Sequence, residues 1–189
     1  STVGDDSQDG LSWLTAKYTI QTAIDAAAEG DTVFVAEGVY NQSLKLKKAV
    51  HILGGYSAAT GEYNTEAFLT ILDGTSLNTP LVNQSAVLSQ ATYVSGLVLQ
   101  NANHTANGGA VVLKTNGVLT HCTIRNCYTT GSGGAVYNAK GTVTNCIIEL
   151  CEALGAGGAV HNMGGVVENT IIRGCKGNYA AIRNESDGI

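Results

Sequence analysis

The chain has 189 residues, about the length of one domain, and 24 of them are glycine while one is proline. Only 13% of the residues are charged and 44% are hydrophobic, a composition that excludes an intrinsically disordered protein and a charge-rich coiled coil. The net charge of -5, with ten lysines and arginines, gives no basic stripe, so we expect no nucleic-acid partner; no apolar run reaches the ~20 residues of a membrane-spanning helix.

Residues 1–11 are predicted to form a flexible acidic tail. Asp5, Ser7 and Asp9 match the first half of a calcium-binding loop, but its twelfth position holds Ala16, where such a loop needs a bidentate glutamate. We therefore expect no metal site, and these three residues are the one calcium candidate. No cofactor is expected.

Residues 19–28 are predicted to form an amphipathic helix. Ile20, Ala23, Ile24 and Ala27 have the i, i+3, i+4, i+7 spacing of one helix face, and Gly30 ends the pattern. A strand is predicted directly after it. A helix in this place would cap the apolar end of a stack of strands and protect their edges.

Residues 31–107 are predicted to form irregular turns of short strands. A polar segment within them, residues 57–67, is predicted to be a loop that leaves the body of the domain. The expected strands, in chain order, cover residues 32–36, 43–46, 50–53, 70–72, 87–88 and 94–99.

Residues 108–189 are predicted to form regular repeats with an incomplete last turn. The motif Gly-Gly-Ala-Val begins at Gly108, Gly133 and Gly157, and a weakened copy begins at Tyr179, so the steps are 25, 24 and 22 residues. Each unit contains three short β-type stretches bounded by Gly and Asn, which tolerate tight corners. We predict one triangular solenoid turn per unit, with successive turns stacked at the ~4.8 Å spacing of parallel strands.

Stacking assigns the side chains to columns, because strand residues alternate between the inside and the outside of the solenoid. The cysteines follow the repeat and do not have the spacing of a zinc site, so we interpret them as small buried residues, with disulfide bridging as the alternative. The expected inward columns are Val111/Val136/Val160/Ile182, Leu119/Val143/Val167, Ile124/Ile148/Ile172, Cys122/Cys146 and Cys127/Cys151/Cys175.

Two outward faces are the candidate functional surfaces. The first aligns Val112 with the candidate ligand-binding residues, which combine an aromatic ring, an imidazole, a guanidinium and neighbouring turn amides suited to a sugar chain. These candidates are Tyr137, His161, Arg183, Asn138 and Asn162, with Asn184 in the same turn column. The second face, a candidate partner surface, stacks the apolar Ile147 and Ile171 beside an exposed ion-pair ladder of Arg125, Glu149 and Arg173.

The repeat motifs resemble a known superfamily. Gly-Gly-Ala-Val followed by Tyr137-Asn138 or His161-Asn162, alternating with Asn-Cys-Ile-Ile strands, is similar to the right-handed parallel β-helix proteins of the pectate-lyase-like superfamily. The similarity is greatest to the repeats of polymorphic outer-membrane proteins, which carry Gly-Gly-Ala-Ile and Phe-x-x-Asn. In the second motif the present chain has Ile and Cys columns where that family has Phe and Asn. The resemblance implies an all-β, right-handed, single-stranded parallel β-helix, and a secreted or cell-surface bacterial protein whose leader has been removed.

We expect a secreted or cell-surface, adhesin-like module that binds a glycan or a protein partner. No catalytic constellation is recognisable, because the outward acids of the repeats, Glu149 and Glu168, fall on different faces. The alternative is a polysaccharide lyase or glycoside hydrolase whose unknown catalytic residues lie in loops or in turns beyond this chain. The last turn has no capping element, so we expect either a longer protein or edge-to-edge self-association at the C-terminal turn.

Overall fold

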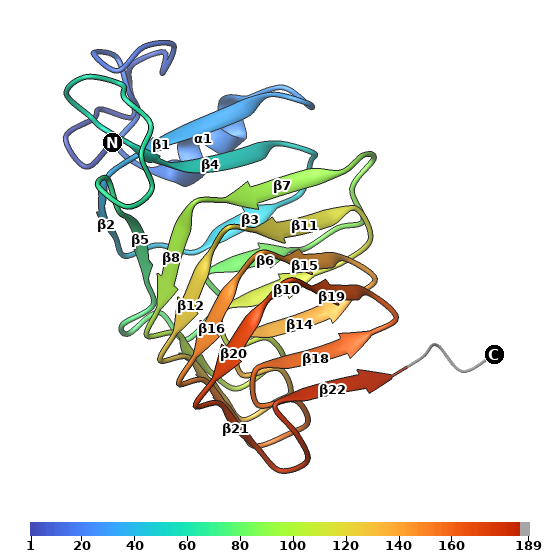
Figure 1. Cartoon of the computed structure of the whole chain (residues 1–189). Helices are drawn as coiled ribbons and strands as arrows, with labels where there is room; N and C mark the ends of the chain where they lie inside the picture. Colours follow the sequence, from blue (N-terminus) through green and yellow to red (C-terminus); the bar gives the residue numbers. More distant parts are fainter. Residues whose placement is uncertain (186–189) are drawn as a thin grey trace.

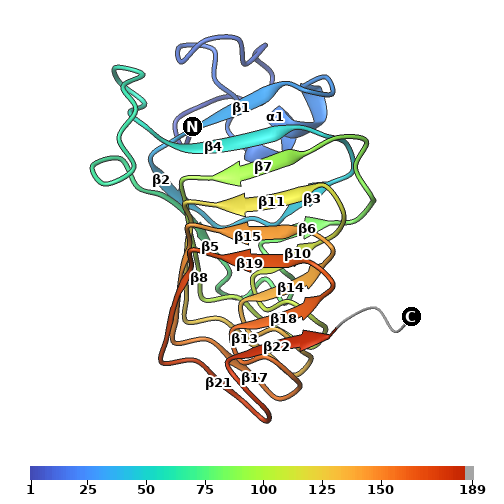
Figure 2. The same ribbon diagram turned by 45° about the vertical axis from the view of Figure 1, so that its right-hand side comes forward.

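Short parallel strands stack into a solenoid of six coils in the computed structural model, which describes residues 1–185 (Figure 1). Each strand pairs with the equivalent strand of the coil before and after it, so the sheets run along the solenoid (Figure 2). The predicted fold class, an all-β parallel β-helix with an N-terminal helix, is confirmed. The predicted end of the repeat region, residues 186–189, lies outside the described residues.

Four sheets form the sides of the solenoid. Sheet A contains β1 (Thr32–Ala36), β4 (His51–Tyr56), β7 (Thr92–Ser95), β11 (Gly117–Thr120), β15 (Thr142–Thr144) and β19 (Val166–Glu168). Sheet B contains β2 (Gly38–Tyr40), β5 (Thr70–Asp73), β8 (Leu97–Gln100), β12 (Thr123–Arg125), β16 (Ile147–Glu149) and β20 (Ile171–Arg173). Sheet C contains β3 (Leu44–Leu46), β6 (Val82–Gln84), β10 (Val111–Leu113), β14 (Val136–Ala139), β18 (Val160–Met163) and β22 (Ile182–Glu185). Sheet D contains β9 (Asn103–His104), β13 (Tyr128–Thr129), β17 (Glu152–Ala153) and β21 (Lys176–Gly177).

The core consists of the predicted inward columns. Ile124 pairs with Ile148, and Ile148 pairs with Ile172, so one side chain lies directly above the next along the axis. Ile124 and Ile148 are fully buried, whereas Ile172 at the last coil is partly buried. Burial of one such side chain stabilises the fold by about 1.5–3 kcal/mol. Because each coil contributes only a few of them, a coil depends on its neighbours.

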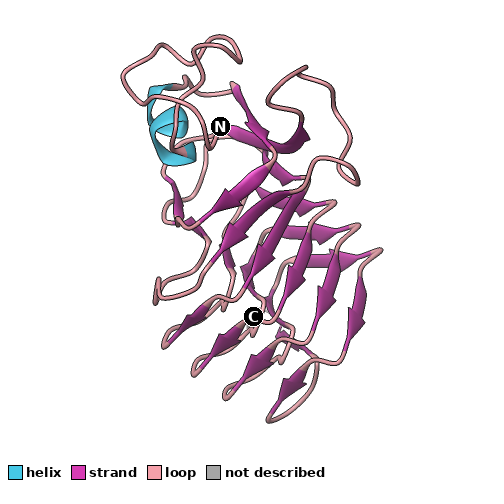
Figure 3. Cartoon of the chain, turned by 90° about the vertical axis from the view of Figure 1, so that its left-hand side faces the viewer, coloured by secondary structure: helices cyan, strands magenta, loops and turns pink. Residues whose placement is uncertain are grey.

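The one α-helix among the described residues, α1 (Ile20–Ala26), lies at the N-terminal end of the stack (Figure 3). Its N-cap is Thr19, whose side-chain oxygen accepts a hydrogen bond from the backbone N–H of Thr22 at 3.2 Å. Ile20 and Ile24 are buried in the core and the helix packs against β1 and β3, which confirms the predicted capping role. The helix is shorter than the predicted range 19–28, because its C-cap is already Ala27, in an extended conformation.

Several strand predictions were wrong in the irregular half. Residues 87–88 form no strand. The second coil instead contributes β6 to sheet C, a strand that the sequence does not predict because its inward residue Gln84 is polar. The predicted run 94–99 is two strands, since Gly96 adopts a positive φ of 70° and turns the chain from β7 into β8. β2 was not predicted.

The predicted triangular coil is also corrected. From residue 103 onward each coil has a fourth strand, in sheet D, of only two residues. Two residues are too few to produce a recognisable alternation of apolar and polar positions. The first two coils have no strand in sheet D, and a loop, residues 74–81, connects sheet B to sheet C in the second coil.

The N-terminal segment folds onto the cap. Asp5 donates its backbone N–H to the carbonyl of Ala16 at 2.9 Å, and Gly10 donates to Thr15 at 2.9 Å. The carboxylate of Asp6 accepts the backbone N–H of Thr19 at 2.8 Å, which lowers its pKa from the ordinary value. Residues 1–11, predicted as a flexible tail, are therefore hydrogen-bonded to residues 15–19, beside the start of α1. Residues 57–67 form the predicted loop.

Candidate functional site

The outer face of sheet C carries the predicted column. The register aligns Val112 with Tyr137, Tyr137 with His161, and His161 with Arg183. It also extends the column into the irregular half, where Val112 pairs with Asn83 and Asn83 pairs with Lys45. The alignment predicted for the four repeat residues is therefore confirmed, and two polar residues precede them.

A groove of about 520 Å³ opens over this column at its central coils. Its floor is the outer surface of β6, β10 and β14. Its walls are the connections that lead into sheet C in the second and third coils. The lining residues are Asn78, Thr79, Pro80, Asn83, His104, Thr105, Ala106, Asn107, Val112, Lys114 and Tyr137.

The wall formed by residues 104–107 is held by a buried histidine. His104 is 4% exposed; its Nε2 lies 2.7 Å from the carbonyl oxygen of Gly108, and its Nδ1 accepts the backbone N–H of Ala106 at 3.1 Å. Because Nδ1 accepts, Nε2 carries the proton and donates it to Gly108. Asn107 is held from the other side, since its Oδ1 accepts the backbone N–H of Ser132 at 2.9 Å. The wall is thus fixed to the coil below.

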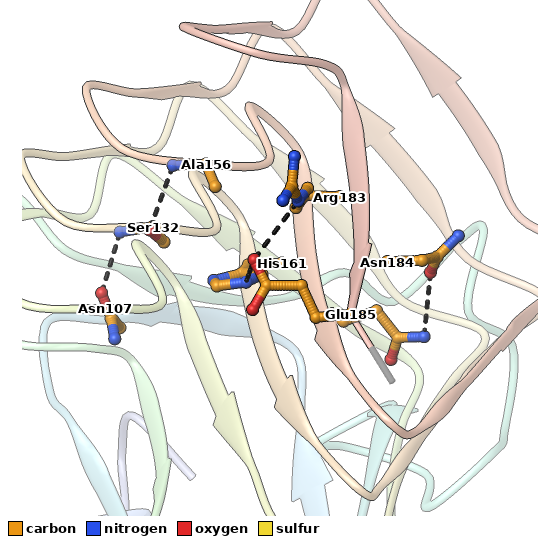
Figure 4. Close-up of polar contacts among 8 residues, drawn as sticks. Asn107, Ser132, Ala156, His161, Arg183, Asn184 and Glu185 are labelled. Atoms are coloured by element: carbon orange, nitrogen blue, oxygen red, sulfur yellow. Dashed lines mark hydrogen bonds and ion pairs between the residues drawn. The ribbon is translucent and has the colours of Figure 1, made fainter. Parts of the chain in front are cut away.

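The stacked corner continues beyond the groove (Figure 4). Ser132 accepts the backbone N–H of Ala156 on its Oγ at 3.0 Å, so Asn107, Ser132 and Ala156 are linked coil by coil. These links place the corner loops in register with the strands of sheet C that follow them. The corners that border the outer face of sheet C therefore repeat from coil to coil, as its strands do.

The groove differs in charge from the molecule as a whole. The chain has a net charge of -5, yet the lining residues within 1–185 include no carboxylate and one ammonium group, on Lys114. The Lys114 ammonium donates to the carbonyl of Ser85 at 2.9 Å, which holds it at the groove. Amides, hydroxyls and backbone groups supply the other polar atoms. The site is therefore neutral to basic and rich in both donors and acceptors.

Tyr137 and His161 lie next to each other at one end of the groove. Their ring centroids are 5.3 Å apart with an interplanar angle of 79°, an edge-to-face contact. His161 is 8% exposed, and its Nε2 lies 3.3 Å from Oε1 of Glu185, within ion-pair distance if the ring is protonated. The geometry of that contact does not make a hydrogen bond, and in the described part of the chain neither ring nitrogen has a hydrogen-bond partner. Arg183 Nε reaches the same Glu185 oxygen at 3.2 Å (Figure 4).

Asn138 and Asn162 are not available to a ligand. They were predicted as outward turn residues, but they lie within β14 and β18 and point inward, Asn138 fully buried and Asn162 8% exposed. Asn138 Nδ2 donates to Asn162 Oδ1 at 2.8 Å, and Asn162 Nδ2 donates to Asn184 Oδ1 at 3.0 Å. This amide ladder satisfies the buried polar groups, which is why asparagine can replace apolar residues there.

Sequence reasoning missed most of the groove. Asn83 would have been found by its register with Val112, had β6 been placed correctly. Asn78 and Asn107 lie in loops of unequal length, for which the repeat gives no register. Lys114 follows β10 directly, and no motif or repeat position in the sequence marks it as a binding residue.

The predicted partner face is the outer side of sheet B. Ile147 and Ile171 are 37% and 60% exposed and belong to an outward column that is apolar in five of its six positions. The register gives this column as Val39, Ile71, Val98, Thr123, Ile147 and Ile171. A partner at this stripe stays a prediction.

The polar ladder beside that stripe forms in part as predicted. Arg173 Nε donates to Glu149 Oε2 at 2.7 Å, which is the predicted ion pair. Arg125 instead donates to the side-chain oxygen of Gln100, at 2.7 Å from Nη2. Gln100 in turn donates to Asp73 at 2.7 Å. The ladder is therefore two separate groups.

The cysteines lie in the predicted columns as five free thiols, four buried and Cys175 partly exposed. Burial raises the pKa of Cys146 to about 11 and also raises the pKa of Cys122, so both remain protonated at neutral pH.

The carboxylates of the calcium candidates accept hydrogen bonds from nearby backbone groups: Asp5 Oδ1 accepts from Ser7 N at 2.9 Å, and Asp9 Oδ1 accepts from Leu11 N at 3.0 Å. Among residues 1–185 no group of three or more His, Cys, Asp and Glu side chains could hold a metal ion.

Comparison of the chain with protein-family models, with curated proteins and with solved structures found no match. Within the described residues, none of the helical structure has the length and apolar character needed to span a membrane. Function therefore has to be argued from the groove itself.

Proposed function

We propose that this protein binds a neutral or acidic glycan in the groove on the outer face of sheet C. The observation that carries the proposal is the composition of the lining: amides, hydroxyls, one lysine and one half-buried tyrosine ring, with no carboxylate in the described part of the groove. A glycan presents many hydroxyls that both donate and accept hydrogen bonds. Asn side chains offer both roles in one group, which suits such a ligand.

The arrangement along the axis supports a chain-like ligand. Asn83, Val112 and Tyr137 belong to successive coils, so their side chains recur at the ~4.8 Å spacing of parallel strands. Half-buried Tyr137 can stack its ring on a sugar while its hydroxyl hydrogen-bonds. A repeating polymer that follows the axis would meet an equivalent position on each coil.

The charge of the groove favours binding over cleavage. A glycoside hydrolase needs a pair of carboxyl groups across the scissile bond, and none lines this groove among the described residues. The lysine within the groove, and Lys45 in the column beyond it, attract uronate or sulfate groups and repel cationic sugars. The proposal includes a secreted or cell-surface location, where such polymers are encountered.

Isothermal titration calorimetry with three soluble polymers tests the proposal: a neutral β-glucan, polygalacturonate and the cationic polymer chitosan. We expect binding to the first or second and none to the third. Tyr137→Ala should weaken binding at least tenfold, whereas Tyr93→Ala, an exposed tyrosine on sheet A, should leave it unchanged.

Other outcomes would overturn the proposal. Binding to chitosan alone would contradict the charge argument, and equal binding by both tyrosine variants would place the ligand elsewhere. No binding to any of the three polymers would also count against it. New reducing ends or unsaturated products after incubation would favour the enzymatic alternative, a lyase or hydrolase.

A further inference from the structure

A second hollow, of about 790 Å³, lies at the N-terminal end of the solenoid. It shares no lining residue with the groove on sheet C. One wall is the face of α1 that carries Ile20, Ala23 and Ala27, and another is the N-terminal segment around Trp13. The remaining wall is β1, at the end of the stack where the loops gather (Figure 3).

β1 borders this hollow with its edge. It is the terminal strand of sheet A, paired on one side by β4, and no other described strand pairs with it. The lining includes every residue from Asp31 to Val35. Because side chains alternate between the two faces of a strand, five consecutive residues can line one space only if the strand's edge faces it.

The hydrogen bonds to β4 show which backbone groups face the hollow. His51 donates its N–H to the carbonyl of Asp31 at 2.8 Å, so this carbonyl, directly before β1, points toward β4. The next residue along a strand points its N–H and C=O the other way. The backbone groups of Thr32 and Phe34 therefore point into the hollow, spaced as a neighbouring strand requires.

The opposite wall suits the side chains of an extended peptide. Ala23, Ala26 and Ala27 present small apolar groups, which leave room between the helix and the strand edge. Trp13 and Phe34 stand at the rim, and Phe34 is 54% exposed. A glycan would use the edge donors but not the alanine wall, whereas a strand with alternating apolar residues uses both.

The charged side chains that line the hollow indicate the charge of its ligand. Asp9 and Asp31 both line the hollow and are exposed. Lys17 also lines the hollow, and its ammonium donates to the carbonyls of Asp6 and Gln8. The two carboxylates outnumber this one lysine side chain, so they are complementary to a basic residue on the ligand.

We propose that the groove between β1 and α1 is a peptide-binding site. An extended segment of a partner protein, apolar at alternate positions and carrying a Lys or Arg, adds to β1 as a further strand of sheet A. Backbone hydrogen bonds to Thr32 and Phe34 give the affinity, and the alanine wall selects the side chains. This site is independent of the glycan groove.

The test uses a phage-displayed random dodecapeptide library panned on the full chain, followed by titration of the enriched peptides. Phe34→Pro removes one of the two N–H groups that face the groove, a change that edge strands tolerate, and Phe34→Ala removes the ring but keeps the N–H. We expect enriched peptides with alternating apolar residues and a basic residue. Phe34→Pro should bind them about two- to tenfold more weakly than Phe34→Ala, the value of one hydrogen bond.

A second pair of variants avoids the strand. Ala26→Trp fills the groove from an exposed helix position and should abolish binding, whereas Asp25→Trp, on the same helix outside the lining, should not. Hydrogen exchange should slow at the Thr32 and Phe34 amides when a peptide is added. The proposal is overturned if no peptide is enriched, if Ala26→Trp binds as well as the original chain, or if these amides show no protection.

Discussion

The two halves of the solenoid differ in regularity, and the difference coincides with where a ligand could bind. From residue 108 to 185 each coil has four strands and its corners stack on those of the next coil. Before residue 108 the first two coils lack the sheet D strand; residues 41–43 connect sheet B to sheet C in the first coil, and a longer loop, residues 74–81, connects them in the second. Both hollows described above border this irregular half. One lies where the second coil meets the third, and the other lies at the capped end.

The regular coils act as a scaffold because their inward side chains pack against, or hydrogen-bond to, the equivalent side chains of neighbouring coils. Apolar columns fill the interior, and the amide ladder from Asn138 to Asn184 occupies the remaining inward positions. Both hollows are lined by segments that depart from the repeat, such as the loop of residues 74–81 and the N-terminal segment. At the N-terminal end, α1 packs against β1 and β3 of the first coil, and the unpaired edge of β1 borders the second hollow.

The largest effect should come from the core column shared by both halves. Leu72 and Ile148 are each fully buried in sheet B, in an irregular and a regular coil. We expect Leu72→Ala and Ile148→Ala each to lower the free energy of unfolding by about 2–5 kcal/mol. Ile172→Ala, in the same column but partly exposed in the last coil, should have a clearly smaller effect. Urea unfolding followed by circular dichroism measures all three, and equal values for Ile148 and Ile172 would contradict the stacking account.

The amide ladder, found only in the regular half, should give the next largest effect. Asn138 Oδ1 accepts the N–H of Gly141 at 2.9 Å, and its Nδ2 donates to Asn162. Asn138→Ala leaves buried groups without partners, and we expect a loss of about 1–3 kcal/mol. Asn184→Ala, at the exposed end of the ladder, is the control and should change stability less. Thermal melts of the two variants distinguish them.

A corner residue allows a stabilising change. Asn126 and Leu150 occupy equivalent corners of adjacent coils, each with φ of 54°, a left-handed conformation that costs leucine more than asparagine. Leu150 is 61% exposed, so little core packing is lost. We expect Leu150→Asn to raise stability by about 1 kcal/mol. The reciprocal change Asn126→Leu should lower it; a higher melting temperature for Asn126→Leu would show that the corners do not set stability.

The smallest effect concerns pH. Burial alone would raise the pKa of Asp73, but hydrogen bonds from Thr75, Gln100 and Asn101 outweigh it and lower the pKa to about 2. Because the folded pKa lies below the ordinary value of 3.8, this carboxylate stabilises the fold above about pH 4. That contribution is lost as the pH falls toward 2. Asp73→Asn should flatten this part of the profile of stability against pH, and an unchanged acid limb would contradict the assignment.

The sequence predicted the fold where the repeat is regular and failed where it is not. Residues 24 apart, such as Ile124 and Ile148, lie in one column as expected, because a constant period fixes the register of every strand. The inward direction of Asn138 was missed, because the asparagine column was interpreted as a row of turn residues, whereas hydrogen bonds between the amides allow the column to be buried. The two-residue strands of sheet D gave no pattern to recognise.

The candidate site was predicted in part for the same reason. Tyr137, His161 and Arg183 belong to the repeat and were aligned correctly. The groove beside them depends on loops of unequal length, around Asn78 and Asn107, whose position follows from packing against the coil below. No spacing in the sequence encodes that position.

The most direct test of the central claim is a titration of the ¹⁵N-labelled protein with the polysaccharide that binds in calorimetry, followed by NMR. The account predicts that the backbone amides of Asn83, Lys114 and Tyr137, and those of the wall at Thr105 and Asn107, shift together with one affinity. Shifts confined to the outer face of sheet B, to the groove beside β1, or absent from the sheet C face would contradict it.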